Sequence, residues 1–448
     1  LMVSTASRVG VGNIAGVATA QQPPVVQGPE SVNDWFKAGQ QFIHDSKSVR
    51  EFNRPAKNVI LFIGDGMSPA HRVAARLLAK GIAEGKAQGK LAIDDMPHMA
   101  LVATAGSDSI ITDSANAASA FATGHKTAVN ALGGYADRSE NAFDDPRVES
   151  VASIAKRRLG MAVGIVTNTE IEDATPAAMI AHTRRRSTYD EIVEQFFASK
   201  PDVLMGGGAA HFLPRGTNGG RRADDGDYVA KFRDAGYAVA TTAAEMSDAS
   251  KRSDKLLGLF NPGNMDGALD RRFLKGGTVK KYPEQPDLTE QVSAAVEVLS
   301  RNPQGFFLMV ESGLIDKFTH ALDMERAVYD TIMLDNAVKL ARDWAKARGD
   351  DGQRRGQRPG SGTASSSPGN SGGRGGWLRG ARRTACHPLP CGVLRYWWSW
   401  WCSGCGPGDT RSPPAVVSTS RPSPRYTPGR RPPSRRTGAA RVAWGRGH

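Results

Sequence analysis

Residues 58–66 (NVILFIGDG) decide the fold of this chain. The apolar run in this stretch is continuous rather than alternating, which is typical of a parallel strand that is buried on both faces. The run ends in Gly64-Asp65-Gly66, where the two glycines let the backbone turn sharply and leave the Asp65 carboxylate at the strand end. We therefore expect a central parallel strand with a functional loop at its carboxyl end.

Strand and helix patterns alternate through the following roughly 280 residues, a length that fits one large α/β domain. We expect strands at 99–106, 161–167, 203–205 and 305–313, and helices at 69–80, 148–158, 175–182, 188–198, 226–234, 288–303 and 324–347. The rest of 215–287 has weak periodicity and is interpreted as loops. The alternation predicts an α/β three-layer sandwich with a mostly parallel, doubly wound central sheet, whose ligands bind at the carboxyl ends of the strands.

Ser114 lies at the predicted start of a helix. It follows Thr112-Asp113 and precedes an Ala-rich run that ends at Gly124. Backbone N–H groups at a helix start point at whatever the serine holds, and the helix dipole favours an anion there. A phosphate group would suit this position. The alternative is an ordinary N-cap, a role that Asp and Ser often have before an apolar run.

Three other predicted strand ends carry polar side chains. They offer Asp65, Asp173, Thr175, Arg186, Glu311, Asp316, Lys317 and His320. Each has an ordinary alternative: a loop acid, an N-cap at Thr175, or a solvated basic run around Arg186. Asp316 and His320 are four residues apart on one helical face, which suits either a shared metal or a simple hydrogen bond. Their joint placement at successive strand ends favours one common site.

Four segments resemble motifs of the alkaline phosphatase family, in the family's order, over residues 55–348. They are NVILFIGDGMS, TDSANAASAFATGHKT, DATPAAMIAHTRRR and VESGLIDKFTH. The resemblance implies hydrolysis of phosphate monoesters through a phosphoserine intermediate on Ser114, with Arg186 clamping the phosphate. Asp173 and Lys317, in place of two histidines, make the resemblance one to the bacterial type. The chemistry agrees, because a serine hydroxyl needs activation and an arginine fork matches two phosphate oxygens.

The same resemblance implies two zinc ions and one magnesium ion. Asp65 would bridge a zinc and the magnesium, and Thr175 and Glu311 would complete the protein ligands of the magnesium. Asp173 and Lys317 would hold waters around the magnesium, and Lys317 would also reach the phosphate through water. Asp316 and His320 would bind the other zinc. Two such metals stabilise the entering and leaving oxygens of an in-line displacement.

The zinc ligands are expected to be incomplete. The family continues past the long helix with a strand that ends in an Asp-His pair, and it supplies one more histidine later. Here only His387 and His448 follow His320, and neither follows an aspartate. Zinc usually takes three or four protein ligands. This leaves a second hypothesis, a catalytically inactive, magnesium-binding member of the family.

The composition changes after about residue 351. The segment 352–448 has seventeen arginines, no lysine, all four cysteines and six of the eight tryptophans, whereas 44 of the 45 acidic residues precede it. The overall charge of +13 therefore comes from this segment. We expect residues 55–351 to form a truncated alkaline phosphatase-like domain with an incomplete sheet. The segment 352–448 is interpreted as a disordered Arg/Pro/Gly-rich tail, hypothetically translated out of frame.

Alternatives for the tail are a zinc module of Cys386, Cys391, Cys402 and Cys405, and a polyanion-binding or nucleic-acid-binding segment of arginines and tryptophans. The irregular cysteine spacing and the slightly acidic body disfavour both.

Residues 1–54 are interpreted as a leader or linker. Ala18-Thr19-Ala20 fits the end of a signal peptide, which predicts a periplasmic or secreted protein, and a plain leader is the alternative. No apolar run is long enough to span a membrane. The sequence leaves open whether the chain forms a homodimer.

Overall fold

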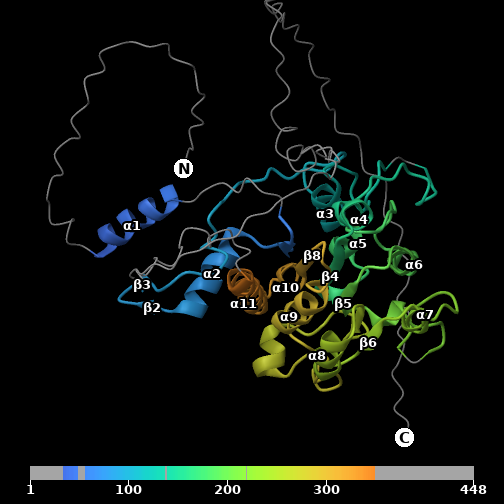
Figure 1. Ribbon diagram of the computed structural model, residues 1–448. Coiled ribbons are helices and arrows are strands. Elements are labelled where there is room, and N and C mark those ends of the chain that lie inside the picture. The colour runs from blue at the N-terminus through green and yellow to red at the C-terminus, as the bar shows by residue number, and fades with distance from the viewer. Residues whose placement is uncertain (1–33, 49–55, 137–138, 218, 349–448) are drawn as a thin grey trace, which may run out of the picture. The chain divides into compact units, whose positions relative to one another are not determined.

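The computed structural model describes residues 34–48, 56–136, 139–217 and 219–348, so the predictions for 1–33 and 352–448 lie outside the described residues. At its centre is a six-stranded sheet in the order β1-β8-β4-β5-β7-β6, in which every neighbouring pair is parallel (Figure 1). The strands are β1 (Val59–Gly64), β4 (Ala162–Glu170), β5 (Val203–Gly207), β6 (Ala238–Ala240), β7 (Leu256–Leu259) and β8 (Phe306–Ser312). A separate two-stranded ribbon joins β2 (Ile82–Ala83) and β3 (Lys86–Ala87). The predicted parallel sheet is confirmed, but the prediction of residues 58–66 as a central strand buried on both faces is wrong, because β1 is the outermost strand of the described sheet, pairs with β8 alone there and is only partly buried.

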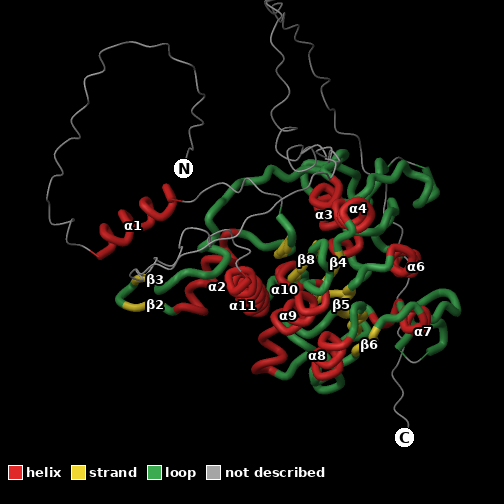
Figure 2. Tube along the Cα trace, viewed as in Figure 1, coloured by secondary structure: helices red, strands yellow, loops and turns green. Residues whose placement is uncertain are grey.

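Helices cover both faces of the sheet, because alternate side chains of its central strands point to opposite sides (Figure 2). On one side, Ile165 and Met309 pack in a core with α3 (Ser114–Thr123), α4 (Val151–Leu159), α5 (Ala174–Ala178), α6 (Tyr189–Ser199) and α7 (Tyr228–Asp234). On the other, Val166 and Leu308 pack with α8 (Ala243–Arg252), α9 (Leu288–Leu299), α10 (Leu314–His320) and α11 (Met324–Arg348). The predicted three-layer α/β sandwich is therefore confirmed.

Local sequence signals explain where several helices begin and end. α2 (Pro69–Lys80) has the predicted bounds, with a proline in its first turn, where its missing N–H costs nothing. α9 begins with a reciprocal pair of hydrogen bonds between Asp287 and Glu290. The remaining elements are α1 (Asp34–Ser48), η2 (Ala209–His211) and η3 (Asp270–Leu274). α1 lies within residues 1–54, which we interpret from the sequence as a leader or linker.

The register of the sheet brings three strand ends together. Gly64 of β1 pairs with Ser312 of β8, and Thr167 of β4 pairs with Glu311 of β8. Because all three strands run in the same direction, Asp65, Glu311 and the loop after β4 lie together along the carboxyl ends of the strands, which we call the carboxyl edge of the sheet. This is the edge at which doubly wound proteins bind ligands.

The predicted strand at 99–106 is wrong. This stretch has no regular structure, and Met99, Leu101 and Val102 are exposed, Leu101 by 98%. A strand needs a neighbour for its backbone hydrogen bonds, and none of the described strands pairs with residues 99–106. The apolar composition that suggested a strand therefore has no ladder to join.

The interpretation of 215–287 as mostly loops is also wrong. The predicted helix appears as α7, but β6, α8 and β7 follow it and extend the sheet by two parallel strands. These strands have only three and four residues, which is too short for a periodicity signal. The predicted helix at 175–182 ends early at Ala178, because the chain turns to pair Thr183 with Leu132.

In the described part of the chain, none of the helices combines the length and the apolar character that a membrane crossing requires.

Gly305 offers a test of how β8 is seated beside β1. Its φ is +87°, and a Cβ there would lie 1.9 Å from the carbonyl oxygen of Lys57. Gly236 has a similar φ of +85° but open space around it. Gly236→Ala should lower the free energy of unfolding by about 1–2 kcal/mol through backbone strain alone. Gly305→Ala should lose at least about 2 kcal/mol more, because backbone atoms must move. Denaturant unfolding measures both, and equal losses would contradict the proposed packing.

Candidate active site

Ser114 is the first residue of α3, as predicted, and Asp113 caps the helix. The Asp113 carboxylate accepts a hydrogen bond from the N–H of Asn116 at 3.0 Å, and the Asn116 side chain accepts one from the N–H of Asp113 at 3.0 Å. The helix ends before Gly124, which adopts a left-handed φ of 74°. Glycine takes this conformation without strain because it has no Cβ. This reciprocal cap fixes the start of α3 and so the position of the serine.

The hydroxyl of Ser114 reaches the end of the neighbouring strand. Its Oγ donates a hydrogen bond to Oδ2 of Asp65 over 2.8 Å. Burial and the nearby Asp316 carboxylate raise the pKa of Asp65, whereas the hydrogen bond from Ser114 opposes that rise. The serine and the acid that the sequence placed in separate loops are therefore direct partners.

Asp173 holds two cations at the same edge. Its Oδ1 accepts a hydrogen bond from Nη2 of Arg186 at 2.6 Å, and its Oδ2 accepts one from Nζ of Lys317 at 2.6 Å. Burial disfavours ionisation of Asp173, but the two cations outweigh it and lower its pKa. A second guanidinium nitrogen, Nη1 of Arg186, donates to Asp113 over 3.2 Å. The guanidinium therefore lies next to the start of α3.

Glu311 lies beneath these groups and is fully buried. Its Oε2 accepts a hydrogen bond from Oγ1 of Thr167 at 2.5 Å, and Thr175 also donates to its carboxylate. Burial, followed by the charge of Asp65, raises the pKa of Glu311 to about 8. The charge of Asp65 thus opposes the ionisation of Glu311, and a divalent cation beside these two acids is electrostatically favourable.

Asp316 and His320 lie at the outer side of this group. Nε2 of His320 is 3.2 Å from Oδ2 of Asp316, and the His320 side chain is 78% exposed. Asp316 lies directly over Gly66, where a Cβ would be 2.5 Å from its Oδ1. Glycine at this position therefore makes room for the aspartate.

The donor set fits magnesium but not a complete zinc site. Asp65, Thr175 and Glu311 offer oxygen atoms only, and Mg²⁺ typically takes one or two carboxylates and keeps several waters. Across the described ranges, no three His, Cys, Asp or Glu side chains gather as the ligands of one metal ion. Structural and catalytic zinc sites need at least three such ligands. Asp316 and His320 supply two.

Polar residues of β4 belong to this site and were not predicted from the sequence. Thr167 and Thr169 both donate to Glu311, and Asn168 bonds to the loop after β8. All three are buried. The available signal was a run of four polar residues, Thr167-Asn168-Thr169-Glu170, at the end of an otherwise apolar strand. A second role was also missed for Asp113, the contact with Arg186.

Glu172 is a buried acid beside the site, and neither of its carboxylate oxygens has a hydrogen-bond partner. It occupies the space left by the missing side chain of Gly208, where a Cβ would be 2.1 Å from its Oε2. Burial, together with the neighbouring acids Glu170, Asp173 and Asp190, raises its pKa well above the ordinary value. Glu172 therefore costs stability when it ionises.

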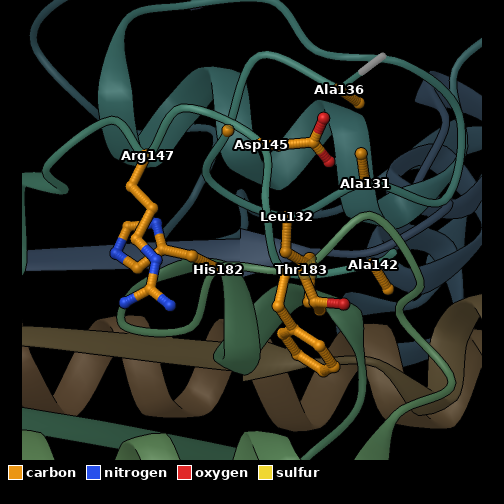
Figure 3. A pocket seen from close by; sticks show the side chains of 10 residues that line it. Ala131, Leu132, Ala136, Ala142, Asp145, Arg147, His182 and Thr183 are labelled. Atoms are coloured by element: carbon orange, nitrogen blue, oxygen red, sulfur yellow. The ribbon is translucent and has the colours of Figure 1, made fainter. Parts of the chain in front are cut away.

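A small cavity of about 10 Å³, room for about one water molecule, lies apart from these residues. His182 and Arg147 lie side by side at one end of it (Figure 3). His182 bonds to the carbonyl oxygen of Gly133 at 2.7 Å, and burial lowers its pKa. None of the predicted site residues lines this cavity, so we do not assign it to the site.

The fold and the site together define a class of protein. A doubly wound parallel sheet carries, at the carboxyl edge of its strands, a serine at a helix start, an arginine beside it and a group of buried acids. This arrangement is that of an α/β protein with a site for an anion and a divalent cation.

Comparison with known proteins makes the assignment specific. Residues 56–351 match the model of the alkaline phosphatase family, and the chain belongs to that family. It is 34% identical over 340 residues to alkaline phosphatase of Escherichia coli K12, covering 66% of this chain and 69% of that protein. It is 32% identical to the tissue-nonspecific isozyme of Gallus gallus, covering 70% and 66%. The predicted family is thus confirmed.

Solved structures agree with this assignment. The crystal structure of the Thermus thermophilus alkaline phosphatase matches with a TM-score of 0.58 and 30% identity, covering 66% of this chain and 58% of that one. A mutant of TAB5 alkaline phosphatase, described with Mg bound in the M3 site, matches with a TM-score of 0.54 and 27% identity, covering 66% and 75%. The chain therefore spans less than two thirds of the Thermus thermophilus enzyme.

Glu172 generates a stability prediction. Its pKa is higher in the folded than in the unfolded chain, so the folded state binds more protons and stability falls as the pH rises from about 4.5. Glu172→Met removes the charge at similar volume and should raise the free energy of unfolding at pH 8 by about 1–3 kcal/mol. The gain should shrink towards pH 5. Denaturant unfolding at both pH values, with the exposed Glu191→Met as control, measures it. A loss of stability at pH 8 would refute the account.

Proposed function

We propose that this chain hydrolyses phosphate monoesters, with Ser114 as the nucleophile and residues 55–351 as the catalytic domain. The observation that carries the proposal is the hydrogen bond between Ser114 and Asp65 at the start of α3. It places a serine hydroxyl where helix N–H groups face an incoming anion. The family assignment supports hydrolysis of phosphate monoesters in general.

The chemistry of the nucleophile follows from its partner. Because the hydroxyl of Ser114 donates to Asp65, its proton lies on the carboxylate side and an oxygen lone pair is free to attack phosphorus. Attack forms a phosphoserine and releases the alcohol of the ester, and water then hydrolyses the phosphoserine to inorganic phosphate. Asp65 is placed to accept the serine proton, because its Oδ2 lies 2.8 Å from the hydroxyl oxygen.

Arg186 is the proposed phosphate clamp. Its shorter contact, 2.6 Å to Asp173, orients the guanidinium, and its longer contact, 3.2 Å to Asp113, is the one that we expect a phosphate to displace. A planar guanidinium can then bind two phosphate oxygens at once. Lys317, held on the other oxygen of Asp173, adds positive charge at the same edge.

We assign a magnesium ion to Asp65, Thr175 and Glu311. When bound, the ion would supply positive charge that offsets the two carboxylates and the charge developing on the phosphate. The zinc ions that the family resemblance implies are not assigned a step, because Asp316 and His320 offer two ligands. Periplasmic or secreted localisation and the state of the chain as monomer or homodimer stay predictions.

Release of p-nitrophenol from its phosphate ester tests the proposal. With Mg²⁺ and Zn²⁺ added, the purified protein should exceed Ser114→Ala by at least about 100-fold, because the variant lacks the nucleophile. Ser247→Ala, an exposed serine on α8, should keep the parent rate. Mass spectrometry after acid quenching should find phosphate on Ser114. Equal rates for the parent and Ser114→Ala would exclude the enzyme.

A second candidate function is that of an inactive, magnesium-binding member of the family. The incomplete zinc ligand set favours it. This protein would bind Mg²⁺ and phosphate but show no difference between the parent and Ser114→Ala in the assay above.

The magnesium assignment has its own test, because both functions require it. Glu311→Gln keeps the size and the acceptor oxygen for Thr167 but removes one ligand charge. It should weaken Mg²⁺ binding, measured by calorimetry, by at least about tenfold. The exposed Glu191→Gln is the control. Unchanged Mg²⁺ affinity in Glu311→Gln, with the fold intact by circular dichroism, would remove Glu311 from the site.

A further inference from the structure

Asn168 is buried in β4 and uses its whole side-chain amide. Its Oδ1 accepts hydrogen bonds from the N–H groups of Gly313, at 2.9 Å, and Leu314, at 3.2 Å. Its Nδ2 donates to Oγ of Ser312 at 3.2 Å and to Oδ1 of Asp330 at 3.2 Å. All four bonds thus reach groups outside β4, and three of them reach residues 312–314, where β8 ends and α10 begins.

Gly313 and Leu314 are where α10 begins, and the first N–H groups of a helix have no partner within it. Gly313 has no side chain that could cap the helix, so Asn168 performs this task from another strand. Gly313 is also confined by its neighbours, because a Cβ there would lie 2.7 Å from Cγ2 of Thr169 and 3.2 Å from Cδ of Glu311. The start of α10 is therefore fixed from β4.

Asp330 completes this arrangement from α11. It is fully buried, its Oδ1 accepts from Asn168, and its Oδ2 accepts from the N–H of Ala268 at 3.2 Å. Two N–H donors on one side of the Asn168 amide and a carboxylate on the other allow one orientation of that amide. Asp330 thereby orients Asn168, and Asn168 holds α10.

We propose that Asn168 and Asp330 are positioning residues for the phosphate site, because they set where α10 places Asp316 and Lys317. This rests on the proposed function. Lys317 follows Leu314 by one helical turn, and it reaches Asp173 with a 2.6 Å hydrogen bond that a small shift of α10 would break. A misplacement of about 1 Å can cost on the order of 100-fold in rate. The hydrogen bonds of Asn168 and Asp330 go to each other and to residues 268 and 312–314, rather than to the residues proposed to hold phosphate or magnesium.

Exchange of the two side chains provides the test. Asn168→Asp sets a carboxylate against Asp330. Asp330→Asn sets an amide nitrogen either against that of Asn168 or against the N–H of Ala268, so it loses one of the two bonds that hold this side chain. The double variant Asn168→Asp, Asp330→Asn reverses the direction of the bond and satisfies every partner again. Asn302→Asp, in an exposed turn, is the matched control. The measurements belong at about pH 8.5, above the pKa of Asp330, which burial raises to about 7.

Hydrogen exchange and binding of inorganic phosphate are the two readouts besides activity. In each single variant the amides of residues 313–320 should exchange at least about tenfold faster, with exchange in β8 unchanged. Phosphate affinity should fall by about tenfold or more, and kcat for p-nitrophenyl phosphate should fall more than KM rises. The double variant should recover all three.

Two results would overturn the proposal. One is that the single variants keep the parent's exchange and phosphate affinity. The other is that the double variant is no better than the worse single variant. If the parent itself neither binds phosphate nor differs from Ser114→Ala in rate, the proposed function fails, and exchange at 313–320 alone decides whether Asn168 and Asp330 hold α10.

Discussion

The site depends on one buried carboxylate, Asp173, and the two cations that it holds. Moving a carboxylate from water into the protein interior costs on the order of several kcal/mol of desolvation free energy. Here two short hydrogen bonds from Arg186 and Lys317 offset that cost. The three residues come from α5, the loop before α6 and α10, so this ion pair joins parts of the chain that are far apart in sequence. It also keeps both cations at the sheet edge, where Ser114 faces them.

The acids on the other side of the site are balanced differently. Asp65 and Glu311 lack a cation of their own among the described residues. Burial raises the pKa of both, and the charge of Asp65 raises the pKa of Glu311 further. Their partners are hydroxyl groups, Ser114 for Asp65 and Thr167 for Glu311. A hydroxyl can donate to a carboxylate, but it cannot neutralise it. The charge of Asp173 is thus met by side chains, whereas that of Asp65 and Glu311 calls for a divalent cation.

The sequence predicted the parts of this fold that have strong local signals. The apolar runs of β1, β4 and β8 and the capped helix α3 are continuous and long enough to define their own structure, although β1 is only partly buried. It failed for β6 and β7, because such short strands are defined by their neighbours rather than by their own residues. It also failed at 99–106, where an apolar composition suggested a strand although none of the described strands pairs with this stretch. Motifs indicated the site residues, but only the register of β1 with β8 shows Asp65 beside Glu311.

The contacts that sequence patterns could not give are those that fix geometry. Asn168 and Asp330 are 162 residues apart, and nothing in either local sequence indicates that they meet. Their bond matters because α10 is short, seven residues, and has no cap of its own. A helix of that length has little intrinsic stability, so its position must come from tertiary contacts. The helix that carries Asp316 and Lys317 is therefore only as well placed as the buried polar link that connects β4, α10 and α11. This makes a structural bond between distant residues part of the proposed site.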